Sequence, residues 1–171
     1  MKNSLCSLIN FATFASNTEV KAYGETFFID VGHGGNDPGA LGPDANGNWV
    51  REEADDVLRL SLRVAELIAP YTTYKLSRTG EATLSLAQRS SMANSGGHKY
   101  SISIHRNSFE NPAAKGLEVW WSEWTQSYNT TACINFAQSV YDNVMEQVPV
   151  WTERGLKSGV KLHMTTYPTM P

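Results

Sequence analysis

The sequence predicts an α/β fold, a three-layer sandwich in which helices cover both faces of a mixed, mostly parallel sheet. Short β-prone apolar runs alternate with long amphipathic segments along the chain, which is typical of parallel strands joined by helices. The 171-residue length suits one domain, and a composition that is 41% hydrophobic and 18% charged is ordinary for a globular protein.

The first strand and helix have the clearest signals. Residues 26–31, TFFIDV, are a short apolar run that we expect to form a buried strand. Residues 32–48 are dense in Gly, Pro, Asn and Asp and are expected to form a loop. Residues 52–69 predict a helix, because acidic residues crowd the first turn, apolar residues recur at helical spacing and Pro70 follows.

The alternation of strands and helices continues to the end of the chain. Apolar runs predict further strands at residues 73–78, 100–104, 116–121 and 159–166. Helical spacing predicts further helices at 84–97, which a glycine pair ends, and at 129–148. This order of elements supports a largely parallel sheet.

Charge and composition exclude several classes of partner. The net charge of −3 provides no basic footprint for nucleic acid. No apolar run approaches the roughly 18 residues of a membrane span. The two cysteines, Cys6 and Cys133, lack metal-type spacing. We therefore expect no nucleic acid and no membrane partner, and we expect a monomer.

The N-terminus is set apart from the rest. We expect residues 1–24 to be an extension, poorly ordered or weakly signal-like, and residues 25–171 to be the folded domain. MKNSLCSLINFATFAS has an early lysine and a short apolar stretch, as a secretory signal does. Asn10 and Thr13 interrupt that stretch, so a secretory signal and a loose extension both remain open.

Three potential metal ligands fall at the ends of predicted elements. His33 follows the strand 26–31, His105 follows the strand 100–104, and Glu53 opens the first helix. Ligands gather beyond the carboxyl ends of strands in open α/β sheets, so these side chains can converge. Two imidazoles and one carboxylate form the ligand set of a catalytic zinc site. Singly, each has an ordinary alternative, a hydrogen-bonded loop histidine or a first-turn acid.

Five segments, taken in order, add a more specific pattern: FIDVGHGGNDPGALG, EEADDVLRLSLRVAELI, YKLSRTGEATLSLAQRSSMAN, SISIHRNSFENPAAKGLEVWW and RGLKSG. Together they resemble the zinc-dependent N-acetylmuramoyl-L-alanine amidases of the type-3 group, found in autolysins and phage endolysins. The resemblance implies that His33, Glu53 and His105 bind Zn²⁺. Glu53 is chosen over Glu52 by counting back from AEL at 65–67, and a slip of one residue would exchange them.

The resemblance also implies a reaction, hydrolysis of the amide between N-acetylmuramic acid and the L-alanine of peptidoglycan stem peptides. Zinc would polarise the carbonyl and activate a water. Arg106 and Asn107 are expected to contact the substrate, although Asn107 could equally be a turn former. The partner would be peptidoglycan, and the protein would act at the bacterial cell wall, secreted or released by a phage.

The general base is the part of the family's site that we do not find in this sequence. In the family, a glutamate on the last core strand follows a stretch resembling TTYPTMP, so we expect that base beyond Pro171 and expect 25–171 to lack that strand. Glu118 is the weak candidate within the chain, and a structural role is favoured for it. We expect Arg78 and Arg89 to form ion pairs that tie loops to the helix, and His98 and His163 not to be ligands.

Two alternatives to the amidase hypothesis remain. A catalytically inactive zinc-bearing module could bind peptidoglycan through the same groove, with no base and no turnover. A zinc carboxypeptidase on a related sheet is a weaker alternative, because the VGHGG and SIHRN contexts speak against it.

Overall fold

The computed structural model describes residues 26–106, 115–121, 130–149 and 152–159. The chain divides into two compact units, residues 1–108 and residues 109–171. The predicted extension, residues 1–24, lies outside the described residues.

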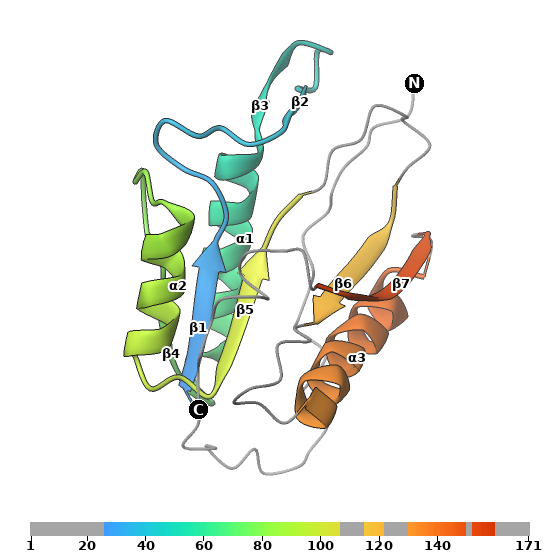
Figure 1. Ribbon diagram of the computed structural model, residues 1–171. Coiled ribbons are helices and arrows are strands. Elements are labelled where there is room, and N and C mark those ends of the chain that lie inside the picture. The colour runs from blue at the N-terminus through green and yellow to red at the C-terminus, as the bar shows by residue number, and fades with distance from the viewer. Residues whose placement is uncertain (1–25, 107–114, 122–129, 150–151, 160–171) are drawn as a thin grey trace. The chain divides into compact units, whose positions relative to one another are not determined.

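A three-stranded parallel sheet forms the centre of the first unit (Figure 1). Its strands are β1 (Thr26–Val31), β4 (Thr73–Leu76) and β5 (Tyr100–Ile104), in the order β4-β1-β5. The central strand β1 is fully buried from Phe28 to Val31, as expected of a strand covered on both faces.

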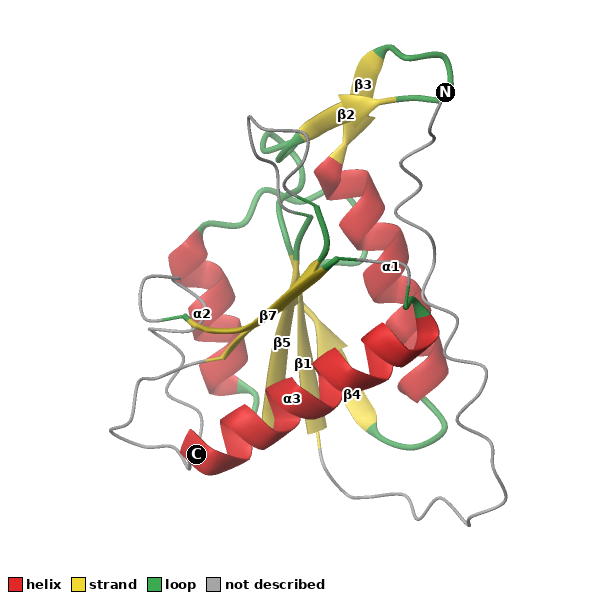
Figure 2. Ribbon diagram, turned by 90° about the vertical axis from the view of Figure 1, so that its right-hand side faces the viewer, coloured by secondary structure: helices red, strands yellow, loops and turns green. Residues whose placement is uncertain are grey.

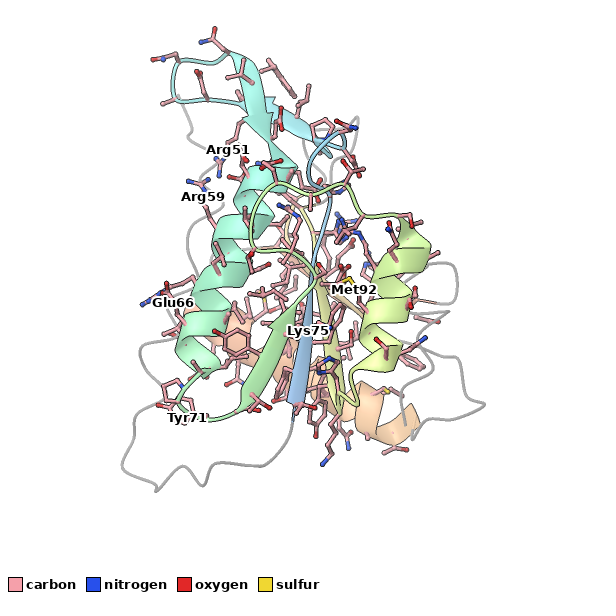
Figure 3. The ribbon with its side chains drawn as sticks, turned by 90° about the vertical axis from the view of Figure 1, so that its left-hand side faces the viewer. Arg51, Arg59, Glu66, Tyr71, Lys75 and Met92 are labelled. Atoms are coloured by element: carbon pink, nitrogen blue, oxygen red, sulfur yellow. The ribbon has the colours of Figure 1, made fainter. Side chains whose placement is uncertain are left out.

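Two helices cover opposite faces of this sheet, α1 (Glu53–Ile68) and α2 (Leu86–Ser95). The chain passes from β1 to β4 on one side and then to β5 on the other, so right-handed connections place the two helices on opposite faces. Figures 2 and 3 show the strands between α1 and α2. The three-layer α/β prediction is therefore confirmed for this unit.

Small and apolar residues let α1 pack against the sheet. Its buried residues recur at helical spacing: Ala54, Val57, Ser61 and Ala65, with Glu53 ahead of them. The outer side of α1 is polar; Arg59 and Glu66 point away from the sheet (Figure 3). α2 begins two residues later than predicted because Ser85 is its N-cap, in a capping box with Gln88.

One element of the first unit was not predicted. A hairpin of β2 (Leu41–Pro43) and β3 (Trp49–Glu52) lies where we expected a loop through residue 48. Its strands are too short for a visible alternation, and its turn is closed by the Asp44 carboxylate, which accepts from the Asn46 and Asn48 N–H groups. The prediction of an unbroken loop over 32–48 is wrong for residues 41–43.

The second unit contains a parallel pair of strands, β6 (Leu117–Trp121) and β7 (Glu153–Ser158), with α3 (Thr130–Gln147) packed on both (Figure 1). The α3 side chains Ala137, Tyr141 and Val144 are buried. The sequence missed β7 because ERGLKS has one aliphatic residue and a glycine with φ of 74°. The strand predicted at 159–166 lies outside the described residues beyond Gly159, which is not in a strand. None of the helices in the described ranges is long and apolar enough to cross a membrane.

Candidate metal centre

The two histidines meet at the carboxyl ends of neighbouring strands. Val31 of β1 pairs with Ile104 of β5, so His33 and His105 each follow closely on the last paired residues. The chain leaves β1 toward β4 and returns on the other side to form β5. Ligands in α/β sheets commonly bind at such a reversal of strand order.

The carboxylate comes from the first residue of α1. The Ala40 carbonyl accepts the Glu53 backbone N–H at 2.9 Å. This hydrogen bond fixes the start of the helix beside the metal loop, residues 32–40, which joins β1 to β2 and carries His33. The Glu53 residue is 3% exposed. Glu52 is the N-cap residue and makes no side-chain cap. The structure therefore brings Glu53, of the two adjacent glutamates, to the imidazoles.

The three donor atoms form a regular triangle. His33 Nε2 lies 3.2 Å from Glu53 Oε1, His105 Nδ1 lies 3.2 Å from the same oxygen, and the two nitrogens are 3.2 Å apart. A tetrahedral zinc with bonds of about 2.0–2.1 Å separates its ligand atoms by about 3.3 Å. The residues present thus fit a tetrahedral metal with three protein ligands and one open position.

The backbone at His33 adopts an unusual conformation that its neighbours hold in place. Its φ is 55°, in the left-handed region that non-glycine residues rarely adopt. Arg89 Nη2 donates to the His33 carbonyl at 2.7 Å. Strain of this kind persists where surrounding contacts over-determine it, as at binding sites.

Asp37 orients the His33 ring. Its Oδ2 lies 2.9 Å from His33 Nδ1, and this hydrogen bond is the main reason that the pKa of Asp37 is below its ordinary value. An ionised carboxylate only accepts, so Nδ1 carries the proton and Nε2 has its lone pair free for a metal. Carboxylates orient metal-binding histidines in this way.

Two glycines allow the ligands to approach the backbone closely. A Cβ at Gly32 would lie 2.5 Å from Cε1 of His105, and a Cβ at Gly39 would lie 2.7 Å from Cδ2 of His33. Gly39 also has a φ of 67°. Any side chain at either position would push an imidazole away from the triangle.

Hydrogen bonds hold the Glu53 carboxylate ionised. Burial by itself raises the pKa of Glu53, but His105 and the backbone N–H groups of Arg106 and Ala40 outweigh it and lower the pKa. Arg106 N–H donates to Oε1 at 2.6 Å, and Ala40 N–H donates to Oε2 at 3.0 Å. An ionised carboxylate is the form that binds a metal.

Two buried arginines, Arg78 and Arg89, hold the metal loop through hydrogen bonds to its carbonyl groups. Arg89 pairs with Asp30 at 2.8 Å, which confirms the expected ion pairing. Arg78 instead donates to backbone carbonyls, Gly32 and Ala54 each at 2.8 Å, and so ties the metal loop to α1.

Of the predicted substrate-binding residues, Arg106 lies beside the ligands, where its N–H donates to Glu53 and its guanidinium pairs with Asp56. Asn107 is outside the described residues. In the second unit Glu118 pairs with Lys157 and with Arg154, the latter at 3.1 Å.

Burial raises the pKa of Glu118, but the Lys157 hydrogen bond and further polar contacts outweigh burial, so the pKa is lowered overall. His98 is buried against Phe28, with ring centroids 5.5 Å apart, and is not part of the ligand cluster. His163 is outside the described residues.

Sequence reasoning missed two carboxylates beside the ligands, Asp37 and Asp56. Asp37 stands four residues after His33 in the glycine-rich loop, a spacing that could have pointed to it. Asp56 resembles any first-turn acid of a helix, and nothing local distinguishes it.

Comparisons with known proteins point to one family for this chain. The profile of the Amidase_3 family, N-acetylmuramoyl-L-alanine amidase, matches residues 27–171. The chain is 31% identical over 122 residues to a probable N-acetylmuramoyl-L-alanine amidase, AmiB, of Haemophilus influenzae, covering 70% of this chain and 27% of that protein. It is 30% identical over 151 residues to the sporulation-specific N-acetylmuramoyl-L-alanine amidase of Bacillus subtilis, covering 84% of this chain and 52% of that one.

A solved structure of a related amidase has a similar fold. The crystal structure of N-acetylmuramoyl-L-alanine amidase from Clostridium difficile 630 superposes with a TM-score of 0.74 at 28% identity, covering 86% of this chain and 76% of that one. The chain spans 27% and 52% of the lengths of the two curated relatives above. With a profile match over residues 27–171 and this fold, the chain belongs to the Amidase_3 family of N-acetylmuramoyl-L-alanine amidases.

Proposed function

We propose that this chain hydrolyses the amide between N-acetylmuramic acid and L-alanine in peptidoglycan, with Zn²⁺ held by His33, Glu53 and His105. The observation that carries the proposal is the 3.2 Å triangle of donor atoms at the strand ends of an Amidase_3 chain. Three protein ligands and an open fourth position are typical of catalytic zinc. When bound, zinc supplies a Lewis acid for the amide carbonyl and for the attacking water.

The chain's own residues prepare this site before any substrate arrives. Asp37 fixes the His33 tautomer, and the N–H groups of Ala40 and Arg106 hold the two Glu53 oxygens. The ligands therefore need little rearrangement to bind a metal, which favours tight binding. The site of action that follows from this substrate is the bacterial cell wall.

For Glu118 we propose a structural role. A general base works best with a pKa near the working pH, whereas the pKa of Glu118 is lowered despite burial, by Lys157 foremost. Its two cationic partners both come from β7, so the carboxylate joins β6 to β7. Substrate contact by Asn107 remains a prediction, whereas the side chain of Arg106 already pairs with Asp56.

The experiment is amide cleavage by the full chain. Insoluble peptidoglycan is incubated with the zinc-loaded chain, and newly exposed L-alanine amino groups are measured with and without a chelator. Glu53→Gln removes a ligand charge, and Asp55→Asn on the exposed side of α1 is the matched control. Glu118→Gln is assayed alongside.

We expect chelator-sensitive release with the native chain, with Asp55→Asn and with Glu118→Gln, and none with Glu53→Gln. Loss of activity in a folded Glu118→Gln chain would make Glu118 a catalytic candidate. Release that persists with the chelator or in Glu53→Gln would refute the zinc-dependent hydrolase proposal. Zinc-dependent binding to peptidoglycan without release would favour the wall-binding module, or a reaction whose general base is not among these residues.

A further inference from the structure

Two backbone N–H groups hold the Glu53 carboxylate, and they come from segments outside regular secondary structure. Ala40 N–H donates to Oε2 at 3.0 Å and Arg106 N–H donates to Oε1 at 2.6 Å. Oε1 is also the atom that faces both imidazoles. The position of the Arg106 N–H therefore decides where the metal-facing oxygen lies.

The sheet does not fix this N–H group. The β1–β5 register ends with Val31 opposite Ile104, and Gly32 N–H then donates to the Ile104 carbonyl at 3.3 Å. Arg106 comes two residues later, past the end of β5. Something other than strand pairing must hold its backbone over Glu53.

The Arg106 side chain provides that hold. Its guanidinium turns back over Glu53, where Nη1 pairs with Asp56 and Nη2 donates to the Ala40 carbonyl at 3.1 Å. Asp56 lies three residues after Glu53 and so nearly above it on the helix. The same Ala40 carbonyl accepts the Glu53 backbone N–H at 2.9 Å, so Ala40, Glu53 and Arg106 form a closed set of hydrogen bonds.

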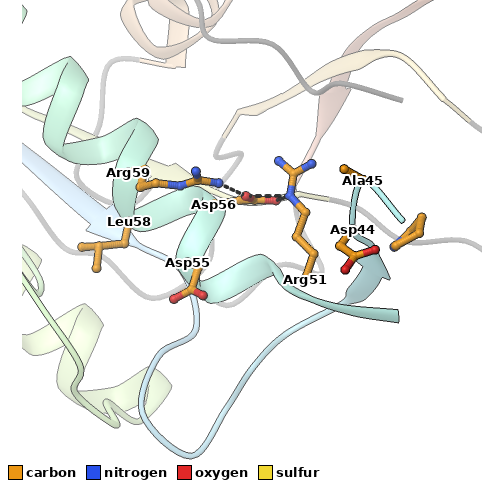
Figure 4. Close-up of a pocket in the computed structure, with 8 residues that line it drawn as sticks. Asp44, Ala45, Arg51, Asp55, Asp56, Leu58 and Arg59 are labelled. Carbon is orange, nitrogen blue, oxygen red and sulfur yellow. Dashed lines mark hydrogen bonds and ion pairs between the residues drawn. The ribbon is translucent and has the colours of Figure 1, made fainter. Parts of the chain in front are cut away.

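Two further ion pairs hold Asp56, the carboxylate that pairs with Arg106, in place. The Asp56 side chain is 9% exposed and also pairs with Arg51 of β3, at 2.8 Å, and with Arg59 (Figure 4). Arg51 and Arg59 approach Asp56 from the hairpin and from the next turn of α1. Asp56 is thus a fixed acceptor onto which Arg106 docks, and the Arg106 side chain is left 21% exposed.

We propose that Arg106 is a positioning residue for Glu53: clamped between Asp56 and the Ala40 carbonyl, it holds its own N–H on the metal-facing oxygen and thereby tightens zinc binding. This inference rests on the zinc site proposed above. Lysine could not fully replace it, because one ammonium cannot span two acceptors as the planar guanidinium does.

The test measures zinc affinity directly, by competition with a chromogenic chelator, on the full chain. We expect Arg106→Ala to weaken zinc binding about 10-fold or more, the usual effect of losing a residue that supports a metal ligand, and Arg106→Lys to weaken it less. Arg63→Ala is the matched control, because Arg63 lies on the same helix but pairs with the exposed Glu66 and not with Asp56. Its zinc affinity should equal that of the native chain.

Steady-state kinetics on peptidoglycan separates this role from direct substrate contact. For Arg106→Ala we expect the loss of kcat at limiting zinc to be restored by excess zinc, with KM unchanged. A raised KM with native zinc affinity would overturn the proposal in favour of substrate binding. If Arg106→Ala does not fold, Arg106→Lys and Asp56→Asn carry the same test, and native zinc affinity in both would overturn it.

The two proposals fail in different ways. A native chain that binds no zinc would sink the zinc site itself and this inference with it. If the native chain binds zinc and Arg106→Ala binds it equally tightly, the zinc site stands and only the positioning role of Arg106 is refuted.

Discussion

The buried pair of Arg89 and Asp30 offers a sharp test of how the metal loop is supported. Asp30 is fully buried and Arg89 is 4% exposed. Arg89 Nη1 donates to Asp30 Oδ1 at 2.8 Å and to the Val31 carbonyl at 2.6 Å. We predict that Arg89→Met strongly destabilises the first unit, because it leaves the Asp30 charge buried with the Ser103 hydroxyl, at 2.7 Å, and without its cation.

The size of the effect follows from what is left behind. Removing one partner of a buried ion pair costs about 3–5 kcal/mol. The Val31 and His33 carbonyls also lose a donor, which points to the upper part of that range. Since typical domains are stable by about 5–15 kcal/mol, the loss would be a large share of the total.

The assay is urea unfolding of the full chain followed by circular dichroism. A double variant, Asp30→Leu with Arg89→Met, should be more stable than Arg89→Met alone, because it also removes the stranded charge. Arg63→Met is the matched control, since Arg63 pairs with Glu66 at the exposed surface and should change stability by less than about 1 kcal/mol.

Two outcomes would refute this reasoning. One is a decrease of less than about 1 kcal/mol in the free energy of unfolding of Arg89→Met, which is the contribution of an exposed ion pair. The other is a double variant whose loss of stability equals the sum of the losses measured for Arg89→Met alone and for Asp30→Leu alone, because the two side chains would then not interact.

Three further predictions concern the metal loop and pH. Asp37→Ala should weaken zinc binding about 10-fold with little change in melting temperature, because Asp37 orients His33 from an exposed position. Gly39→Ala should abolish zinc binding, since its Cβ would lie 2.7 Å from the His33 ring in a left-handed backbone. Burial and the nearby positive charge of Lys75 lower the pKa of His98 from 6.5, so the unfolded chain takes up this proton more readily. Stability should therefore fall as pH drops below about 6.5, and less steeply in His98→Phe.

Gly80→Ala is the control for Gly39→Ala. A Cβ at Gly80 has no neighbouring atom within 4 Å, so this variant should bind zinc as the native chain does. Unchanged zinc affinity in Asp37→Ala would mean that the His33 ring is oriented without Asp37. For His98, urea unfolding is repeated from pH 7 to about pH 5, and identical pH profiles for the native chain and His98→Phe would contradict the prediction.

Local pattern was sufficient for most elements near the site. The sequence predicted β1 and β5 with the bounds that the structure has, and α1 within one residue at each end. These elements are encoded locally, by a short apolar run or by helical spacing with an acidic first turn. Because ligands collect at strand ends, the same local reasoning indicated His33, His105 and one of two adjacent glutamates.

The sequence by itself therefore determined the α/β class, the central strands and the residue types of the metal centre. Only the tertiary structure decided that Glu53 faces the imidazoles, that residues 41–43 form a strand and that Arg106 turns back onto Asp56. The physical reason is the distance along the chain over which each interaction acts. Periodicity and caps act over a few neighbouring residues. The direction of the Arg106 side chain, by contrast, depends on Ala40 and Asp56, which are far from it in the sequence.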